Sequence, residues 1–179
     1  PTILAAGTDE QKERFLPRLL NGEDFWCQLF SEPDAGSDLA NLSTRAVRDG
    51  EEYIVNGSKI WSSGAHQAAF GILIARTNPD TSKHHGISYF ICPMDLPGIS
   101  MEPIVDMTTA HSFNQVFFDD VRLPAELLVG EEEYFIEAKS RQNLNIHQSL
   151  DKAIDKSGSE NTILFWKKLK KRDGNSRRS

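Results

Sequence analysis

Residues 44–61, TRAVRDGEEYIVNGSKIW, decide the fold class of this chain. Short runs of apolar and β-branched residues are separated by Asp49-Gly50 and by Asn56-Gly57. Both dipeptides are typical of type I′ hairpin turns, because both central residues of such a turn have positive φ. The stretch therefore predicts short antiparallel strands joined by tight turns.

Similar runs extend this pattern in both directions along the chain. They lie at residues 25–30, 70–77, 86–92, 98–104 and 114–121, with glycine, proline, asparagine and aspartate between them. The run at 114–121 alternates poorly, so its inward face stays open. Many short strands with such separators are typical of a small barrel. The sequence thus predicts a mainly β fold, a closed or nearly closed antiparallel β-barrel flanked by short helices.

The N-terminal segment has the pattern of a helix instead. Thr8 and Gln11 match a capping box, and an apolar stripe follows at helical spacing. Pro17 would interrupt a continuous helix, so we expect two short helices hinged near Leu16. Asn21-Gly22 is the expected end of this unit.

Composition and charge restrict the classes of function. The 179 residues are 39% hydrophobic, which is ample for the core of one domain and little for two. The net charge of −6 argues against nucleic acid as a partner. No apolar run approaches the roughly 18 residues of a membrane helix. Cys27 and Cys92 lie far apart without a CxxC motif, so we expect neither a metal site nor a disulfide framework.

Two segments contain residues suited to ligand binding. Residues 31–38, SEPDAGSD, place small residues and hydroxyls directly after a strand, where they can cradle a phosphate or a polar ring edge. The alternative is a strand-ending turn that satisfies its own backbone. In residues 56–65, NGSKIWSSGA, Trp61 and two following serines can place an indole and hydroxyls beside a flat ring. Alternatively, this indole belongs to the barrel core.

Together these segments resemble the flavin-contacting motifs of the middle β-domain of the acyl-CoA dehydrogenase family. The similarity continues at residues 74–77, 86–90, 97–99, 117–124 and 128–132. The resemblance implies three parts. Residues 1–22 would end the N-terminal helical domain, 23–132 would form the flavin-binding β-barrel, and 133–179 would be an atypical, weakly helical or disordered tail.

The resemblance also implies a cofactor, FAD, and a substrate, an acyl-CoA thioester. Ser31 would reach the pyrimidine edge of the flavin, and Ser63 would donate its hydroxyl toward flavin N5. Ser37 would lie near the pyrophosphate and the bound acyl-CoA, while Trp61 would pack beside the ring. We expect the Ser31 loop and the Trp61 corner to share one cleft. The full set of implied cofactor contacts is Gln28, Phe30, Ser31, Gly36, Ser37, Trp61, Ser62 and Ser63.

The family's catalytic base is a glutamate of a C-terminal helical domain, and the family pattern stops here after Glu132. We therefore assign no catalytic residue. We expect a fragment, from a truncated or frameshifted gene, that is inactive alone. The parent enzyme would perform α,β-dehydrogenation with hydride transfer to FAD, pass electrons to an acceptor protein and form a homo-oligomer. Its compartment would be cytoplasmic in a bacterium and otherwise mitochondrial or peroxisomal.

Other interpretations remain open. Acyl-CoA oxidases and flavin monooxygenases share this barrel, and a non-catalytic barrel that binds acyl-CoA or a partner is a further alternative. His66 and His111 are candidates to line a substrate channel, although hydrogen-bonded loop histidines are the simpler interpretation. His84-His85 has no third ligand at metal spacing, so we expect a solvated loop there.

Overall fold

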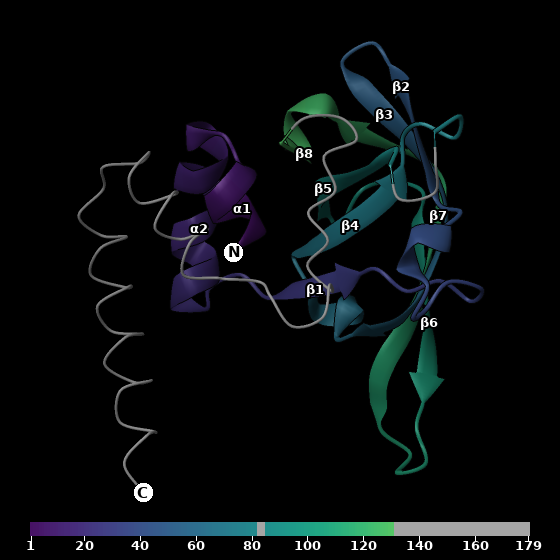
Figure 1. Cartoon of the computed structure of the whole chain (residues 1–179). Helices are drawn as coiled ribbons and strands as arrows, with labels where there is room; N and C mark the ends of the chain where they lie inside the picture. Colours follow the sequence, from purple (N-terminus) through teal and green to yellow (C-terminus); the bar gives the residue numbers. More distant parts are fainter. Residues whose placement is uncertain (82–84, 131–179) are drawn as a thin grey trace, which may run out of the picture.

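The computed structural model describes residues 1–81 and 85–130 and confirms the mainly β fold class (Figure 1). The expected tail at 133–179, and His84, lie outside the described residues. The helices are α1 (Thr2–Ala6) and α2 (Asp9–Asn21), with 3-10 turns η1 (Leu39–Asn41), η2 (Ala65–Gln67) and η3 (Ala125–Leu127). The strands are β1 (Trp26–Leu29), β2 (Arg45–Asp49), β3 (Glu52–Ser63), β4 (Phe70–Arg76), β5 (Ile87–Pro93), β6 (Ile99–Val105), β7 (His111–Pro124) and β8 (Leu128–Val129).

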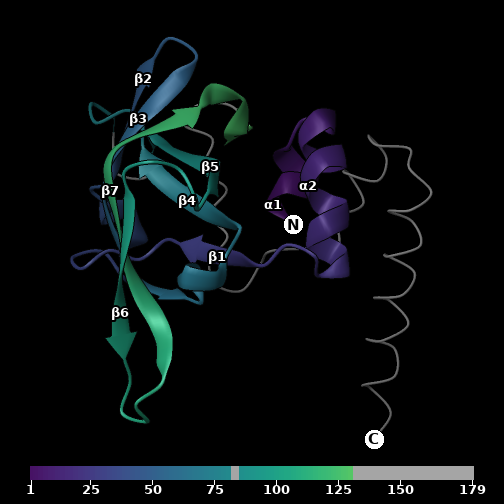
Figure 2. The same ribbon diagram turned by 180° about the vertical axis from the view of Figure 1, so that it is seen from behind.

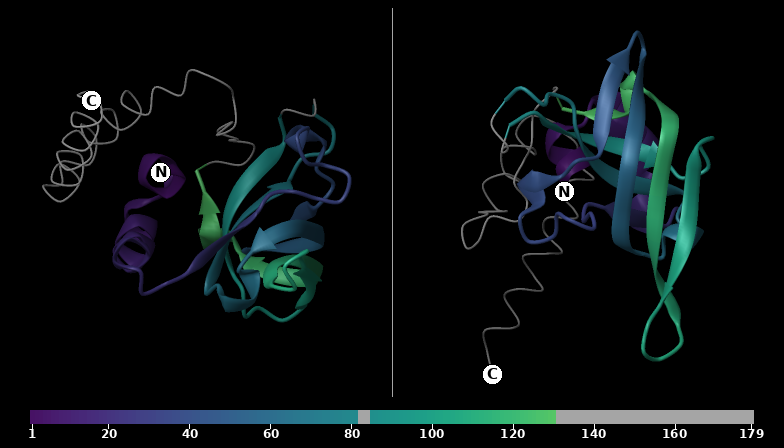
Figure 3. Two further views of the ribbon diagram at one scale, coloured as in Figure 1. Left: turned by 90° about the horizontal axis from the view of Figure 1, so that it is seen from below. Right: turned by 90° about the vertical axis from the view of Figure 1, so that its right-hand side faces the viewer.

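All the described strands belong to one sheet. Its order is β6-β7-β3-β2-β4-β5-β8, with β1 added beside β4. Most neighbours are antiparallel, but β1 runs parallel to β4, and β2 meets β4 in parallel at a single residue pair. Strands β6 and β7 form a long hairpin that extends beyond the rest of the sheet (Figure 1, Figure 3). Within the described residues, no helix is long and apolar enough to cross a membrane.

Of the two predicted hairpins, the structure contains one and not the other. The hairpin at Asp49-Gly50 is confirmed, since β2 and β3 pair around it. Its turn is not of type I′, because Asp49 pairs with Glu52 and, of the two central residues Gly50 and Glu51, only Gly50 has a positive φ (63°). The turn at Asn56-Gly57 is wrong, because β3 runs straight through it with a β-bulge. Strand β7 pairs with β3 on both sides of this dipeptide, so tertiary pairing overrides the local turn preference.

The expected hinge at Pro17 is also wrong. Helix α2 is continuous through Pro17, and the break between helices lies ten residues earlier, at Gly7. Pro17 removes the amide that would bond to the Glu13 carbonyl, but both residues are exposed, so water can replace that bond. The Thr8 capping box is confirmed: the Gln11 amide donates to Thr8 Oγ1 (3.2 Å), and the Thr8 amide donates to Gln11 Oε1 (3.1 Å).

Helix α2 packs against the sheet through one aromatic cluster. Phe15 is buried, with its ring centroid 5.8 Å from Trp26 and 5.3 Å from Phe70. Gln11 adds a polar connection, because its Nε2 donates to the carbonyls of Glu126 and Leu128 at 2.7 Å each. Figure 2 shows α1 and α2 lying together beside the sheet.

The structure shows which side chains of β7 point into the core. Asn114, Val116 and Phe118 are buried and alternate with more exposed neighbours. The alternation shifts at Asp119 and Asp120, where Asp120 has a φ of 48°, and resumes with Val121 inward. One irregular residue therefore explains why the sequence alternates poorly here.

Candidate functional site

The two motifs are hydrogen-bonded to each other, while the cleft that we expect them to share stays a prediction. The Ile60 amide on β3 donates to the Ser31 carbonyl at 2.8 Å. The loop that follows β1 is thus hydrogen-bonded to β3 immediately before Trp61. This contact places the start of the Ser31 loop beside the end of β3 that contains Trp61.

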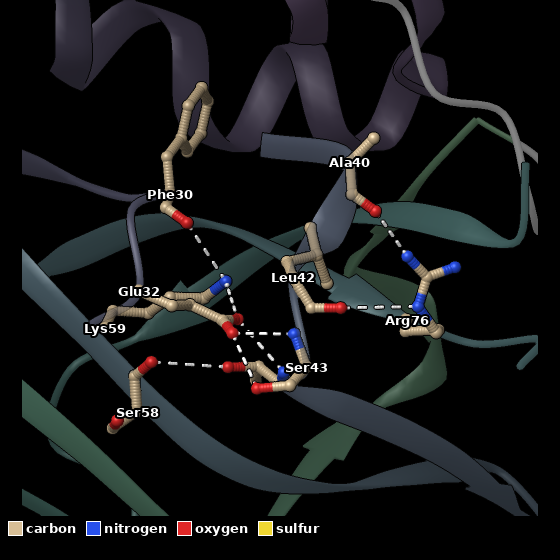
Figure 4. A network of polar contacts seen from close by, with 9 residues as sticks. Phe30, Glu32, Ala40, Leu42, Ser43, Ser58, Lys59 and Arg76 are labelled. Atoms are coloured by element: carbon tan, nitrogen blue, oxygen red, sulfur yellow. Dashed lines mark hydrogen bonds and ion pairs between the residues drawn. The ribbon is translucent and has the colours of Figure 1, made fainter. Parts of the chain in front are cut away.

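A buried ion pair fixes the start of this loop (Figure 4). Lys59 Nζ lies 2.8 Å from Glu32 Oε1, and the two side chains are 0% and 4% exposed. The other carboxylate oxygen accepts from the Ser43 amide (2.6 Å) and hydroxyl (2.8 Å), and Oε1 also accepts from the Thr44 amide (3.0 Å). Lys59 Nζ also donates to the Phe30 carbonyl at 3.2 Å. Both oxygens of the buried Glu32 carboxylate therefore accept hydrogen bonds.

The far end of the same loop is held by Arg76 of β4. Its Nη2 donates to the Ala40 carbonyl at 2.7 Å, and its Nε donates to the Leu42 carbonyl at 3.3 Å (Figure 4). The loop is consequently fixed to β3 at one end and to β4 at the other. Its middle, with Gly36 and Ser37, remains exposed.

The pKa values of the ion pair follow from burial and mutual attraction. Burial alone would raise the pKa of Glu32, but the Lys59 charge and the hydrogen bonds to the carboxylate outweigh it and lower this pKa to about 2. Burial lowers the pKa of Lys59 to about 8, against the opposing effect of Glu32. Both groups are therefore charged at neutral pH.

Sequence reasoning gave Glu32 and Lys59 no role. Each belongs to one of the two motifs, and the charges are opposite. One acidic residue in the first motif and one basic residue in the second could have indicated an ion pair that holds the two motifs together.

Trp61 occupies a bulge at the end of β3. The pairing of β3 with β7 shifts between Lys59 and Ser62, and Trp61 has a φ of 60°, which is uncommon for a bulky side chain. Its side chain is 58% exposed, and its ring meets Phe113 edge-on at 6.0 Å. The indole therefore lies at the surface and does not belong to the barrel core.

The two serines after Trp61 point differently. Ser63 is exposed, opposite Phe113 in the register of β3 and β7. Ser62 is 1% exposed, and its hydroxyl has no hydrogen-bond partner in the described part of the chain. Ser63 can therefore meet a ligand directly, whereas Ser62 does not present its hydroxyl at the surface.

The remaining predicted contacts lie on the strand and loop before this corner. Gln28 is exposed on β1, while Phe30 and Ser31 are partly buried. An exposed indole, an adjacent exposed hydroxyl and a neighbouring loop of small residues fit a flat ring with polar edges. These residues therefore suit a flavin.

A separate cavity of about 540 Å³ lies between α2 and the sheet. It contains none of the predicted cofactor contacts. Its two arginines are engaged, since Arg18 pairs with Asp24 (2.7 Å) and Arg14 with Glu126 (3.3 Å). We therefore place the candidate site at the Trp61 corner. Across the described residues, no group of three or more His, Cys, Asp or Glu side chains could hold a metal ion.

Comparisons with known proteins agree with the motif resemblance. Residues 27–121 match the family described as acyl-CoA dehydrogenase, middle domain. The chain is 52% identical over 130 residues to acyl-CoA dehydrogenase FadE34 of Mycobacterium tuberculosis, covering 73% of this chain and 18% of that protein. It superposes on the Tcur3481-Tcur3483 steroid ACAD with a TM-score of 0.72 and 43% identity, over 74% of this chain and 34% of that one.

A further solved structure, the ChsE4-ChsE5 complex from Mycobacterium tuberculosis, gives a TM-score of 0.71 at 47% identity, over 75% of this chain and 34% of that one. The chain therefore belongs to the acyl-CoA dehydrogenase family, through its middle domain. It spans about a third or less of the length of these relatives.

Proposed function

We propose that this chain supplies the flavin-contacting part of an FAD-dependent acyl-CoA dehydrogenase. The observation that carries the proposal is the exposed Trp61 indole beside Ser63, joined to the Ser31 loop by the hydrogen bond from Ile60. Bound FAD would supply the acceptor for the hydride removed from the acyl β-carbon.

The residues of this chain bind and orient. The Trp61 indole would cover one side of the bound ring, and the Ser63 hydroxyl would donate toward flavin N5. Ser31 contacts the pyrimidine edge, with Gln28 and Phe30 beside it on the preceding strand. Such neutral donors, held in place before the reaction, stabilise developing charge without moving at that moment.

The exposed middle of the loop serves the phosphates. Gly36 and Ser37, which are both exposed, would lie near the pyrophosphate, and Ser37 would also lie near the bound acyl-CoA. The small side chains permit close approach of the ligand to the loop backbone. Ser62 is buried, so its hydroxyl would not contact the ligand.

We propose that the 179-residue chain does not turn over alone, because no catalytic base has been assigned within it. The parent enzyme would act on an acyl-CoA thioester, use an electron-transfer acceptor protein and be oligomeric. Two of the similar structures bear two-component names, which supports an assembled enzyme. The steroid-acting relative supports a bulky acyl group.

FAD titration of the purified chain tests the proposal. We expect FAD binding that Trp61→Ala and Ser63→Ala weaken. Val47→Ala is the matched control, because Val47 is similarly exposed (59%) on β2 and outside the site. FAD affinity that is equal in all four proteins would contradict the proposed site.

Turnover is measured separately. We expect no acyl-CoA-dependent reduction of an artificial electron acceptor by the purified chain, even with added FAD. Robust reduction would refute the proposed need for further chain segments.

A further inference from the structure

Asn114 on β7 is buried directly beneath the Trp61 corner. Its side chain is 1% exposed, and it faces Ser62 in the register of β3 and β7. Asn114 Nδ2 lies 3.1 Å from the Ser62 carbonyl. This carbonyl belongs to the residue that immediately follows the strained tryptophan.

Two histidines complete the contacts of this amide. Asn114 Oδ1 lies 2.7 Å from His111 Nε2, and Asn114 Nδ2 lies 3.1 Å from His66 Nδ1. The two imidazole rings stack, with centroids 4.1 Å apart and planes inclined by 21°. One side chain therefore connects the end of β3, the η2 turn and the start of β7.

The chemistry of the partners fixes the orientation of the amide and the proton positions. A backbone carbonyl only accepts, so the Asn114 atom that faces Ser62 must be the NH₂ group. The oxygen then faces His111, whose Nε2 must carry a proton to donate. His66 Nδ1 must accept, which places the His66 proton on Nε2, so the Gln67 side-chain amide, 3.0 Å from that nitrogen, must turn its oxygen and not its NH₂ group toward it.

Trp61 needs such support. A left-handed φ is unfavourable at a bulky residue, and it persists only where the surroundings fix it. The Asn114 bond to the Ser62 carbonyl holds the peptide on the C-terminal side of the bulge. It thereby holds the direction of the Trp61 indole and the position of the Ser63 hydroxyl.

We propose that Asn114 is a positioning residue for cofactor binding. It acts through the Ser62 carbonyl and holds Trp61 and Ser63 in the geometry that receives the flavin ring. His111 orients the Asn114 amide. This inference rests on the proposed function, but its structural part, the control of Trp61 by Asn114, is independent of it.

The test uses the whole 179-residue chain, the variant Asn114→Ala and two readouts. The first is the NMR signals of Trp61, both its indole Nε1–H and the backbone couplings that report a positive φ. The second is the affinity for FAD. We expect Asn114→Ala to shift or split the Trp61 signals and to weaken FAD binding about tenfold, because a buried carbonyl loses its donor.

Asn56→Ala is the matched control. Asn56 also supports a bulge between β3 and β7, since its Oδ1 accepts from the Asp120 amide and its Nδ2 donates to Asp120 Oδ1, both at 2.9 Å. It lies at the other bulge, so we expect Asn56→Ala to leave the Trp61 signals and the FAD affinity unchanged.

His111→Phe keeps the test decisive if Asn114→Ala does not fold. His111 is exposed, and phenylalanine preserves a flat ring without the donor to Asn114. We expect a smaller shift of the Trp61 signals in the same direction. Unchanged Trp61 signals in whichever of the two variants fold would overturn the proposal. If the wild-type chain binds no FAD, the proposed function fails, while the Trp61 signals still decide whether Asn114 positions the corner.

Discussion

Strand β3 contains two bulges against the same partner, β7, and they are built differently. At the first bulge, Gly57 has a φ of 144°, and an added Cβ would lie 2.6 Å from Thr44 Oγ1. Glycine is required there by both the backbone and the lack of space. At the second bulge, the residue with positive φ is Trp61, whose side chain is exposed.

The difference separates a bulge that the fold requires from the bulge at the proposed cofactor site. The Gly57 bulge lets β3 pass close to the start of β2 without strain. At the second bulge the backbone is strained, and the large ring of Trp61 lies exposed beside the exposed Ser63. Strained residues cluster at ligand sites when neighbouring contacts hold them. Lys59 lies between the two bulges and anchors the strand through Glu32.

The largest loss of stability is expected when the buried Lys59–Glu32 ion pair, which lies between the two bulges, is broken. We expect Lys59→Met to destabilise the fold by about 4 kcal/mol, because it leaves a buried carboxylate without its counter-charge. Urea unfolding followed by circular dichroism measures this loss. Lys12→Met is the control, since Lys12 forms an i,i+3 pair with the exposed Asp9, and we expect at most about 0.5 kcal/mol there. Equal, small losses in both variants would show that the anchor is not needed.

The pH dependence of stability tests the same Lys59–Glu32 ion pair. The pKa of Glu32 is about 2 in the folded chain against an ordinary value of 4.5, so the unfolded chain binds more protons between these values. Stability should therefore fall as the pH drops from about 4.5 toward 2, by roughly 3 kcal/mol from this group. The difference between wild type and Glu32→Gln, measured by urea unfolding at several pH values, isolates it. Parallel profiles would contradict the low pKa.

Substitutions at the bulges themselves sharpen the comparison. We expect Gly57→Ala to destabilise by about 2–3 kcal/mol, because the new methyl group meets Thr44. Trp61→Gly should stay within about 1 kcal/mol of wild type, since relief of strain offsets the lost contact with Phe113. Thermal unfolding compares the two. A Trp61→Gly loss as large as that of Gly57→Ala would mean that the fold requires both bulges.

The smallest expected effect concerns the buried hydroxyl at the second bulge. Ser62→Ala removes an oxygen that has no partner in the described residues, so the free energy of unfolding should be unchanged or slightly higher. Urea unfolding again measures it. A loss above about 1 kcal/mol would indicate a hydrogen bond that forms in solution.

Local sequence signals predicted where strands occur, but not where one strand or helix continues through a residue that usually interrupts it. The Asp49-Gly50 turn and the Thr8 cap depend on neighbouring residues, so the sequence contains the necessary information. The turn assigned to Asn56-Gly57 failed because β7 holds both halves of β3, which no local window contains. The hinge assigned to Pro17 failed because solvent can replace one lost bond in a helix fixed by Phe15.

The candidate site could be located from its motifs but not understood from them. The pairing of the Ser31 loop with Ile60, the burial of Ser62 and the support from Asn114 all depend on residues distant in sequence. The positive φ of Trp61 has no local signal, because tryptophan is an unfavourable choice for it. The family resemblance supplied the cofactor, and the structure supplied the geometry that makes the corner suitable.

The most direct test of the central claim is an intermolecular NOE measurement on the 179-residue chain with FAD. The account predicts contacts from the protons of the flavin ring to the Trp61 indole and to Ser31, and none to Val47 on β2. Contacts confined to other parts of the chain, such as the cavity beside α2, would contradict it.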